Sequence, residues 1–268
     1  MQQESGVGAE RENERLSGVR FLTGLFIMFV AFYSQYLLEG LGQVPGMLLV
    51  YGVPFVAVSL IYGKTILKTA FSHTGPAFKL GISAFSMFEL LGSLVGVVIY
   101  YLLVYFSPES QNQDRQSPLF DAPSRFGWVM MWVSMIVIGP AEEYLFRGFV
   151  YGGLLSLYHK QHWLGLALLS SLFFAIAHIY YAFAYGLASL VVFCDLMAFG
   201  MAMCFTYYFS GGNLIVPALL HGLYDAGGFL TVAVSPSAGT IFRGLMIVAG
   251  VMVAVILAGR SLRQAIST

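Results

Sequence analysis

The sequence contains few charged residues. Asp, Glu, Lys and Arg together make up 10% of its 268 residues, whereas a soluble domain carries about 25%. Hydrophobic residues make up 58% of the chain, and the mean hydropathy is +0.79. This composition excludes a soluble fold and predicts an all-α polytopic membrane protein.

Basic clusters and cysteines are also scarce. The formal net charge is +0, and no group of Lys and Arg is large enough to indicate nucleic acid as a partner. Cys194 and Cys204 lie in one apolar segment, where a helix would hold them about 15 Å apart, too far for a disulfide. Their spacing does not match a metal site and says nothing about the compartment.

Long apolar runs, by contrast, occupy most of the chain. A helix needs about 20 apolar residues to cross a bilayer, and the sequence contains eight candidate runs. We therefore predict about eight transmembrane helices around a polar intramembrane cavity, with a kink at Pro140 in the fourth run. The runs cover approximately residues 20–38, 44–62, 80–106, 126–157, 163–181, 183–209, 213–233 and 240–258.

An even number of spans places both termini on the same side of the membrane. Leaving aside Arg147 of the acidic motif, nine Lys and Arg residues fall on that side, and three, Arg115, Arg125 and Arg243, fall on the other. This asymmetry predicts that both termini are cytosolic. The short termini and compact loops favour a bacterial plasma membrane, and residues 1–18 are polar enough to form a disordered cytosolic tail.

One short segment carries three ionisable residues between apolar flanks: Glu142, Glu143 and Arg147. A charge at bilayer depth costs roughly 2.5–3.5 kcal/mol on insertion scales, so such residues are usually buried, paired and functional. On a helix, Glu143 and Arg147 are i and i+4 and form an ion pair in the favourable order. Glu142 is rotated about 100° away and stays available as a general base. A purely structural ion pair beside a spare acid is the alternative interpretation.

Further polar residues lie inside other runs. His178 ends the fifth run, and a lone histidine of this kind is more often an interior hydrogen bonder than a catalyst. His221 and Asp225 are i and i+4, so we expect Asp225 to accept a hydrogen bond from the His221 ring and fix its tautomer. A polar clamp between helices is the alternative here. Glu89 and Asp195 could each line the cavity or pair with a polar neighbour, and for both we favour the structural role.

Taken together, these residues form three motifs that resemble those of the CPBP family, which comprises the type II CAAX prenyl proteases and their Abi-related, bacteriocin-processing relatives. The family patterns are E-E-x-x-x-R, F-x-x-x-H and H-x-x-x-N or D, in this order. The corresponding segments here are Glu142-Glu143-Tyr-Leu-Phe-Arg147, Phe174-Ala-Ile-Ala-His178 and His221-Gly-Leu-Tyr-Asp225.

The resemblance implies an intramembrane endopeptidase whose substrate is a membrane-associated protein or peptide, with a prenylated CAAX-type tail or a sorting tail as candidates. It also implies a role for each motif residue. Glu142 and His178 would activate the attacking water, Glu143 and Arg147 would hold the site, and His221 and Asp225 would stabilise the oxyanion. Because an ionised Asp225 cannot donate a hydrogen bond, we expect His221, held protonated by Asp225, to be the oxyanion donor.

The resemblance leaves the cofactor open. We favour a metal-independent mechanism with no cofactor; the alternative is a divalent metal such as zinc bound by Glu142, His178 and His221. The predicted organisation is a tail (1–18), N-terminal transmembrane helices with an external loop (19–123), a protease-like core (124–233) and a last helix with its tail (234–268).

Two other functions compete with the protease. Intramembrane acids and histidines also mark the proton relays of transporters, and Glu89 and Asp195 would then join the path. Transporters often contain repeated halves, and the sequence has no internal repeat. A catalytically silent membrane scaffold is the second alternative, and the intact motifs count against it.

Overall fold

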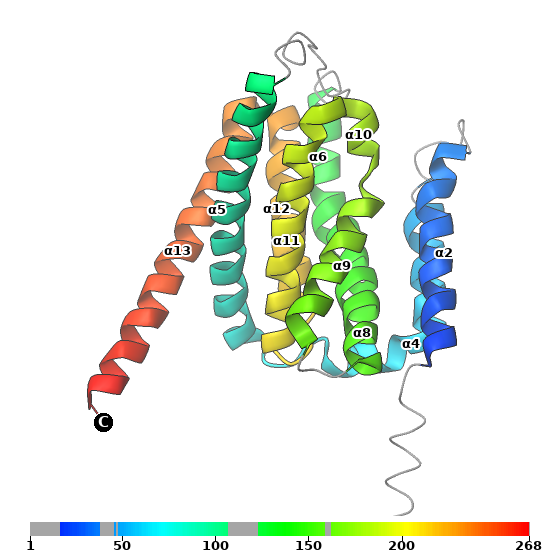
Figure 1. Ribbon diagram of the computed structural model, residues 1–268, viewed down its shortest axis with the longest axis horizontal. Coiled ribbons are helices and arrows are strands. Elements are labelled where there is room, and N and C mark those ends of the chain that lie inside the picture. Colours follow the sequence, from blue (N-terminus) through cyan, green and yellow to red (C-terminus); the bar gives the residue numbers. More distant parts are fainter. Residues whose placement is uncertain (1–16, 38–45, 47, 107–122, 159–161, 268) are drawn as a thin grey trace, which may run out of the picture.

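Every regular element in the part of the chain that the structure describes is helical. The structure is a computed structural model, and it describes residues 17–37, 46, 48–106, 123–158 and 162–267. In Figure 1 the helices run roughly side by side, with α2 (Gly18–Leu37) at one edge and α13 (Pro236–Ser267) tilted away at the other. The predicted all-α class is confirmed.

Six helical segments of the described chain are long and apolar enough to cross a membrane, so the protein is an integral multi-pass membrane protein. The remaining two predicted runs, 20–38 and 163–181, correspond to shorter apolar helices in α2 and in α9 (Trp163–Ala177). The six segments are Leu48–Thr69, Thr74–Phe106, Ser124–Leu157, Gly186–Phe209, Ile215–Ala233 and Pro236–Ser261. Their elements include η1 (Leu48–Gly52), α4 (Val53–Thr69), α5 (Thr74–Phe106), α6 (Ser124–Val133), α11 (Ser189–Phe209) and α12 (Ile215–Ala233).

The predicted fourth run is one composite helix in which wide π-helical turns alternate with α-helix. The short α7 (Gly139–Glu143) carries Pro140 in its first turn, and the π-helical segments η3 (Ser134–Ile138) and η4 (Tyr144–Tyr151) flank it. α8 (Gly152–Leu157) completes the helix. Pro140 offers no N–H to the preceding turn, and π turns are rare features that frequently occur at functional sites.

The predicted boundary between the fifth and sixth runs is wrong. Residues Tyr180–Tyr185 form a separate short helix, α10, and a 3-10 turn, η6 (Gly186–Ala188), precedes α11. Gly186 has a φ of 56°, a conformation that glycine adopts readily, so the chain turns there. Hydropathy alone could not place this turn because the residues on both sides of it are apolar.

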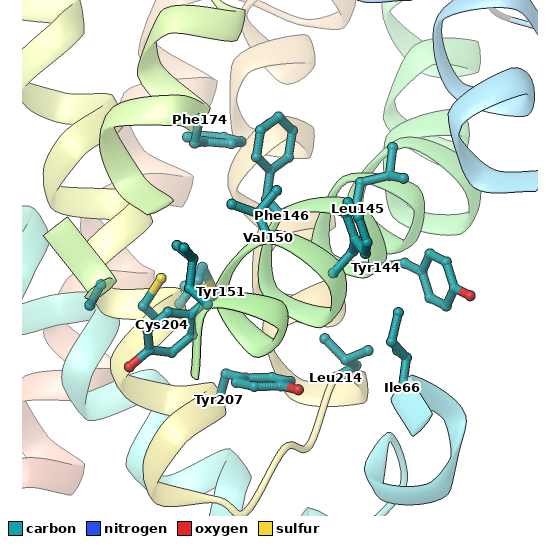
Figure 2. Packing of buried hydrophobic residues seen from close by; sticks show 14 of the residues in the cluster. Ile66, Tyr144, Leu145, Phe146, Val150, Tyr151, Phe174, Cys204, Tyr207 and Leu214 are labelled. Atoms are coloured by element: carbon teal, nitrogen blue, oxygen red, sulfur yellow. The ribbon is translucent and has the colours of Figure 1, made fainter. Parts of the chain in front are cut away.

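The core of the molecule surrounds the composite helix. All residues from 141 to 154 are buried, which is expected of a helix enclosed on every side by protein. Figure 2 shows side chains of η4, including Leu145, Phe146 and Tyr151, extending in different directions, with Ile66 of α4 and Phe174 of α9 among their neighbours. The acidic motif therefore lies on the innermost helix.

The outer helices have the opposite character. In α13 the apolar side chains of Ile241, Leu245, Val248, Met252 and Val255 are all exposed. They recur every three or four residues and so share one face of the helix. A continuous exposed apolar stripe is expected where a helix faces lipid, which agrees with the span assignment.

Candidate active site

The acidic pair lies where two helices approach each other backbone to backbone. A Cβ at Gly139 of α7 would lie 2.8 Å from the backbone nitrogen of Gly222 in α12, and a Cβ at Gly222 would lie 2.6 Å from Cα of Met135. Side chains do not fit at such distances, so the contact requires glycine. The close approach brings Glu143 of α7 beside His221 of α12.

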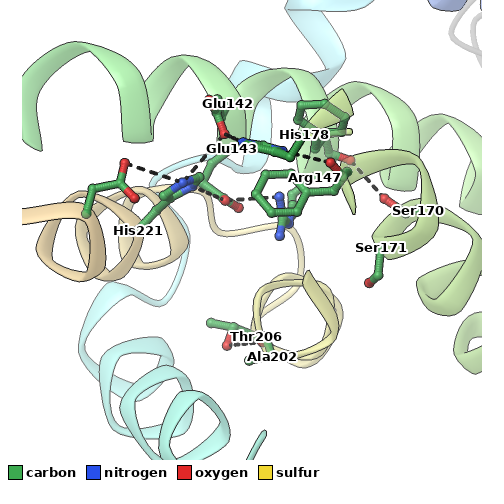
Figure 3. Close-up of polar contacts among 12 residues, drawn as sticks. Glu142, Glu143, Arg147, Ser170, Ser171, His178, Ala202, Thr206 and His221 are labelled. Carbon is green, nitrogen blue, oxygen red and sulfur yellow. Dashed lines mark hydrogen bonds and ion pairs between the residues drawn. The ribbon is translucent and has the colours of Figure 1, made fainter. Parts of the chain in front are cut away.

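Glu143 joins two other motif residues. Its Oε1 accepts a hydrogen bond of 2.7 Å from Nδ1 of His221 and lies 3.1 Å from Nη1 of Arg147, as Figure 3 shows. The predicted ion pair between Glu143 and Arg147 is confirmed. The His221 contact joins residues 78 positions apart, so no local spacing could have indicated it.

Arg147 is buried with a relative exposure of 1%. Besides its ion pair, its Cζ atom lies 4.6 Å from the ring centroid of Phe174 and 5.7 Å from that of Phe199. These cation–π contacts and the Glu143 carboxylate together compensate the guanidinium for its lost hydration. Arg147 therefore holds Glu143 in place and is engaged away from Glu142.

Glu142 contacts a tyrosine and faces two imidazoles, whereas Glu143 is bound to Arg147 and to Nδ1 of His221. Its Oε1 accepts a hydrogen bond of 2.7 Å from the hydroxyl of Tyr51, which comes from η1. Its Oε2 is buried without a hydrogen-bond partner among the described residues and lies 3.8 Å from Nε2 of His178 and 3.6 Å from Nε2 of His221. An unsatisfied buried carboxylate oxygen is uncommon in folded proteins, and this one faces two imidazoles.

His178 follows the last turn of α9 and is oriented by its own helix. Its Nδ1 lies 2.8 Å from the carbonyl oxygen of Phe174. A carbonyl only accepts hydrogen bonds, so Nδ1 carries the proton and donates it. In the neutral ring Nε2 is then an acceptor, and this atom faces Oε2 of Glu142.

The predicted hydrogen bond between His221 and Asp225 is absent. Nε2 of His221 lies 3.8 Å from Oδ2 of Asp225, which is beyond hydrogen-bond distance. The strong contact of the ring is instead that of Nδ1 with Glu143. The close packing of α7 on α12 at Gly222 presents a carboxylate from a second helix, so Glu143, and not Asp225, fixes the orientation of His221.

A cavity of about 510 Å³ opens beside these groups. Glu142, His178, His221 and Asp225 line it, whereas Glu143 and Arg147 lie behind the wall. The structure thus brings all six predicted site residues together, four of them facing one cavity and two supporting it. A buried carboxylate and two histidines at one cavity wall can position and deprotonate a water molecule.

Sequence reasoning missed three residues that also line this cavity. Tyr51 bonds Glu142 from a part of the chain where the sequence shows only hydrophobicity. For Asp195 the sequence favours a structural role, and Arg243 enters the sequence analysis only among the basic residues of one side of the membrane. Glu89 is buried but does not line the cavity. An ionisable or hydroxyl side chain within a membrane span was the signal available for Tyr51 and Asp195.

The three candidate zinc ligands, Glu142, His178 and His221, approach one another at the cavity wall. Among the described residues, no group of three or more His, Cys, Asp or Glu side chains is placed to hold a metal ion. Glu142 gives Oε1 to Tyr51, and Nδ1 of His221 is bound to Glu143. Oε2 of Glu142 and Nε2 of both His178 and His221 are the atoms that face one another.

A comparison with protein families identifies part of the chain. Residues 124–227 match the family described as type II CAAX prenyl endopeptidase Rce1-like, and this span contains all three motifs. No curated protein and no solved structure matches the chain. The buried network of Glu142, Glu143 and His221 is consistent with a Glu/His catalytic site. Residues 124–227 of this multi-pass membrane protein therefore belong to the Rce1-like type II CAAX prenyl endopeptidase family, a family of proteases.

Proposed function

We propose that the protein is an intramembrane endopeptidase that hydrolyses a peptide bond near the end of a membrane-associated protein or peptide. The observation that carries this proposal is the environment of Glu142 Oε2, which is buried, lacks a hydrogen-bond partner among the described residues and faces Nε2 of both His178 and His221 across the cavity. Glu143 and Glu89 also have a buried carboxylate oxygen without a hydrogen-bond partner among the described residues, but of the three glutamates only Glu142 lines the cavity.

In this mechanism Glu142 is the general base. A water molecule held between Oε2 of Glu142 and Nε2 of His178 loses a proton to the carboxylate as its oxygen attacks the scissile carbonyl. The hydrogen bond from Tyr51 to Oε1 orients the carboxylate so that Oε2 points to the water. The proton then passes to the leaving amine, which completes the hydrolysis.

His221 is the group that we assign to the oxyanion. Its Nε2 faces the cavity, and its Nδ1 is fixed by Glu143, so a doubly protonated ring can donate from Nε2 to the developing negative charge. Arg147 keeps Glu143 in position from behind. Oδ2 of Asp225 lies 3.8 Å from Nε2 of His221, where it adds negative potential near the ring.

A comparison of peptide termini tests the proposal without a known substrate. Membrane and secreted proteomes of host cells producing the wild-type protein or Glu142→Gln are compared for new amino and carboxyl termini. We expect a set of termini that depends on the wild-type protein and disappears in the variant. Identical termini with both proteins folded and equally abundant would instead favour a carrier or scaffold.

Glu89→Gln is the matched control for this experiment. Glu89 is also a buried glutamate of a membrane helix, with a relative exposure of 4%, but it does not line the cavity. The same chemical change is therefore made outside the reaction centre. We expect its termini to be those of the wild-type protein, whereas a proton carrier that uses intramembrane acids generally would lose function in both variants.

A further inference from the structure

The cavity continues beyond the catalytic groups to a second polar region. Its lining includes Asp195 of α11, Tyr224 and Gly228 of α12, and Arg243 of α13. Arg243 lies outside the span that matches the protease family. Among the residues that line the cavity it is the sole Lys or Arg, and a guanidinium keeps its charge at any pH that proteins tolerate.

Arg243 is held in place without using up its hydrogen-bond donors. Its Cζ atom lies 4.4 Å from the ring centroid of Tyr224, whose hydroxyl donates to Asp195 and is thereby fixed. The Nε of Arg243 is buried with no hydrogen-bond partner, and no ion pair of this guanidinium occurs within the described residues. An oriented guanidinium with free donors is suited to bind a planar anion.

Glycine in α12 makes room for this side chain. A Cβ at Gly227 would lie 3.0 Å from Cγ of Arg243, and a Cβ at Gly228 would lie 3.2 Å from its Nη2. The guanidinium therefore lies against the same face of α12 that carries His221 and Asp225 toward the cavity. Both ends of the cavity are thus built on one helix face.

We propose that Arg243 is a specificity-determining residue that binds a carboxylate of the peptide substrate at the end of the cavity opposite the catalytic groups. The inference rests on the proposed function for the position of the scissile bond. Three acids surround it: Asp195 accepts from Tyr224 and lies beside Glu89, Asp225 faces the His221 ring, and both Glu89 and Asp225 interact electrostatically with Arg243. Arg243 is nevertheless the sole Lys or Arg on the cavity lining, and its Nε has no hydrogen-bond partner among the described residues, so it is the group there that can bind a substrate anion.

The distance from the Arg243 subsite to the cleaved bond follows from the spacing of His221 and Gly228 along α12. Gly228 follows His221 by seven positions, which corresponds to about 10 Å along a helix. An extended peptide covers about 3.3–3.6 Å per residue. The carboxylate should therefore lie about three residues beyond the scissile bond, as either the carboxyl terminus or an acidic side chain of the substrate.

Peptide binding to a variant that cannot turn over tests this subsite apart from catalysis. The full chain carrying Glu142→Gln is placed in lipid nanodiscs, and a fluorescein-labelled peptide with a farnesylated cysteine followed by three aliphatic residues is titrated as free acid and as carboxyl amide. A charge-assisted bidentate contact predicts binding of the acid tighter than the amide by on the order of tenfold to a hundredfold. A third peptide, an amide ending in Glu, shows whether a side-chain carboxylate serves equally well.

Variants at the subsite complete the test. Arg243→Gln should remove the preference for the acid, and Arg243→Lys should retain part of it because the charge stays while the planar fork is lost. Arg260→Gln, at an exposed arginine of the same helix, should retain all of it. The readout is the ratio between two peptides on one protein, so a general loss of stability does not imitate the expected result.

Three outcomes would overturn the inference. These are equal binding of acid and amide, an acid preference that survives Arg243→Gln, or no binding of any of the peptides to folded protein. Failure of the proposed function looks different. In that case the acid preference would depend on Arg243, but protein with an intact Glu142 would cleave none of the bound peptides.

Discussion

The hydroxyl of Tyr51 is the contact that separates Glu142 from an ordinary buried acid. Removing it with Tyr51→Phe leaves the ring and the packing but frees Oε1 of Glu142. Hydrogen bonds to charged groups contribute about 1.5–3 kcal/mol, so we expect proteolytic kcat to fall by on the order of tenfold to a hundredfold with little change in the melting temperature. Tyr144→Phe, which removes a hydroxyl bonded to Ser59 away from the cavity, should retain activity.

His221 and Asp225 should tolerate substitution unequally. His221→Ala removes both the contact to Glu143 and the proposed oxyanion donor, so nearly all activity should be lost. Asp225→Asn leaves the Glu143 contact intact and offers an amide that can itself donate, so a substantial part of the activity should remain. Single-turnover rates on the terminal peptides identified above would measure both, and equal losses would contradict the assignment of His221.

Individual contacts could be predicted from the sequence only where they are local. The i, i+4 spacing identified the ion pair of Glu143 and Arg147 correctly, and it placed Asp225 beside His221, but the hydrogen bond that it predicted there goes to Glu143 instead. The rule fails there because it considers neighbours on one helix, whereas the partner that His221 selects comes from another helix. Tyr51 lies 91 residues from Glu142, so its hydroxyl within an apolar run was a signal of a polar contact but did not identify the partner.

At the scale of the elements, the contact of α7 with α12 determines whether the site assembles. Gly222→Ala would place a methyl group 2.6 Å from Cα of Met135, which can be relieved only by moving the helices apart. Overpacking of this kind costs about 1–3 kcal/mol, and the distance between Glu143 and His221 would increase. We expect a lower melting temperature and a strong loss of activity. Gly165→Ala, in α9 with nothing within 4 Å of its Cβ position, is the matched control and should be neutral.

Helices as units were largely predictable, and their internal irregularities were not. Apolar runs located the spanning segments because burial in lipid demands long hydrophobic stretches. The π-helical turns on both sides of α7 and the turn at Gly186 leave no mark on hydropathy. They depend on which helix packs against which, and an apolar residue is equally compatible with every such arrangement.

For the whole molecule, the arrangement of spans predicts that one end of the bundle faces the outside of the cell and the other end faces the cytosol. The start of α6 and the end of α13 lie at opposite ends of the bundle in Figure 1. Ser124→Cys and Ser261→Cys place a thiol at exposed positions at these ends. In intact cells an impermeant maleimide should label Ser124→Cys alone, and labelling of Ser261→Cys should require permeabilised membranes. The reverse pattern would contradict the cytosolic assignment of the termini.

The complete burial of residues 141–154 has a consequence for how this protein varies among related sequences. A helix that faces lipid on one side accepts many substitutions on that side. Its tolerance to substitution therefore rises and falls along the sequence with the period of the helix. The segment that carries Glu142, Glu143 and Arg147 has no such side. Its tolerance should be uniformly low, whereas α13 should alternate between permissive and restrictive positions. New specificities are therefore expected to arise by change in the surrounding helices, around an innermost segment that stays nearly fixed.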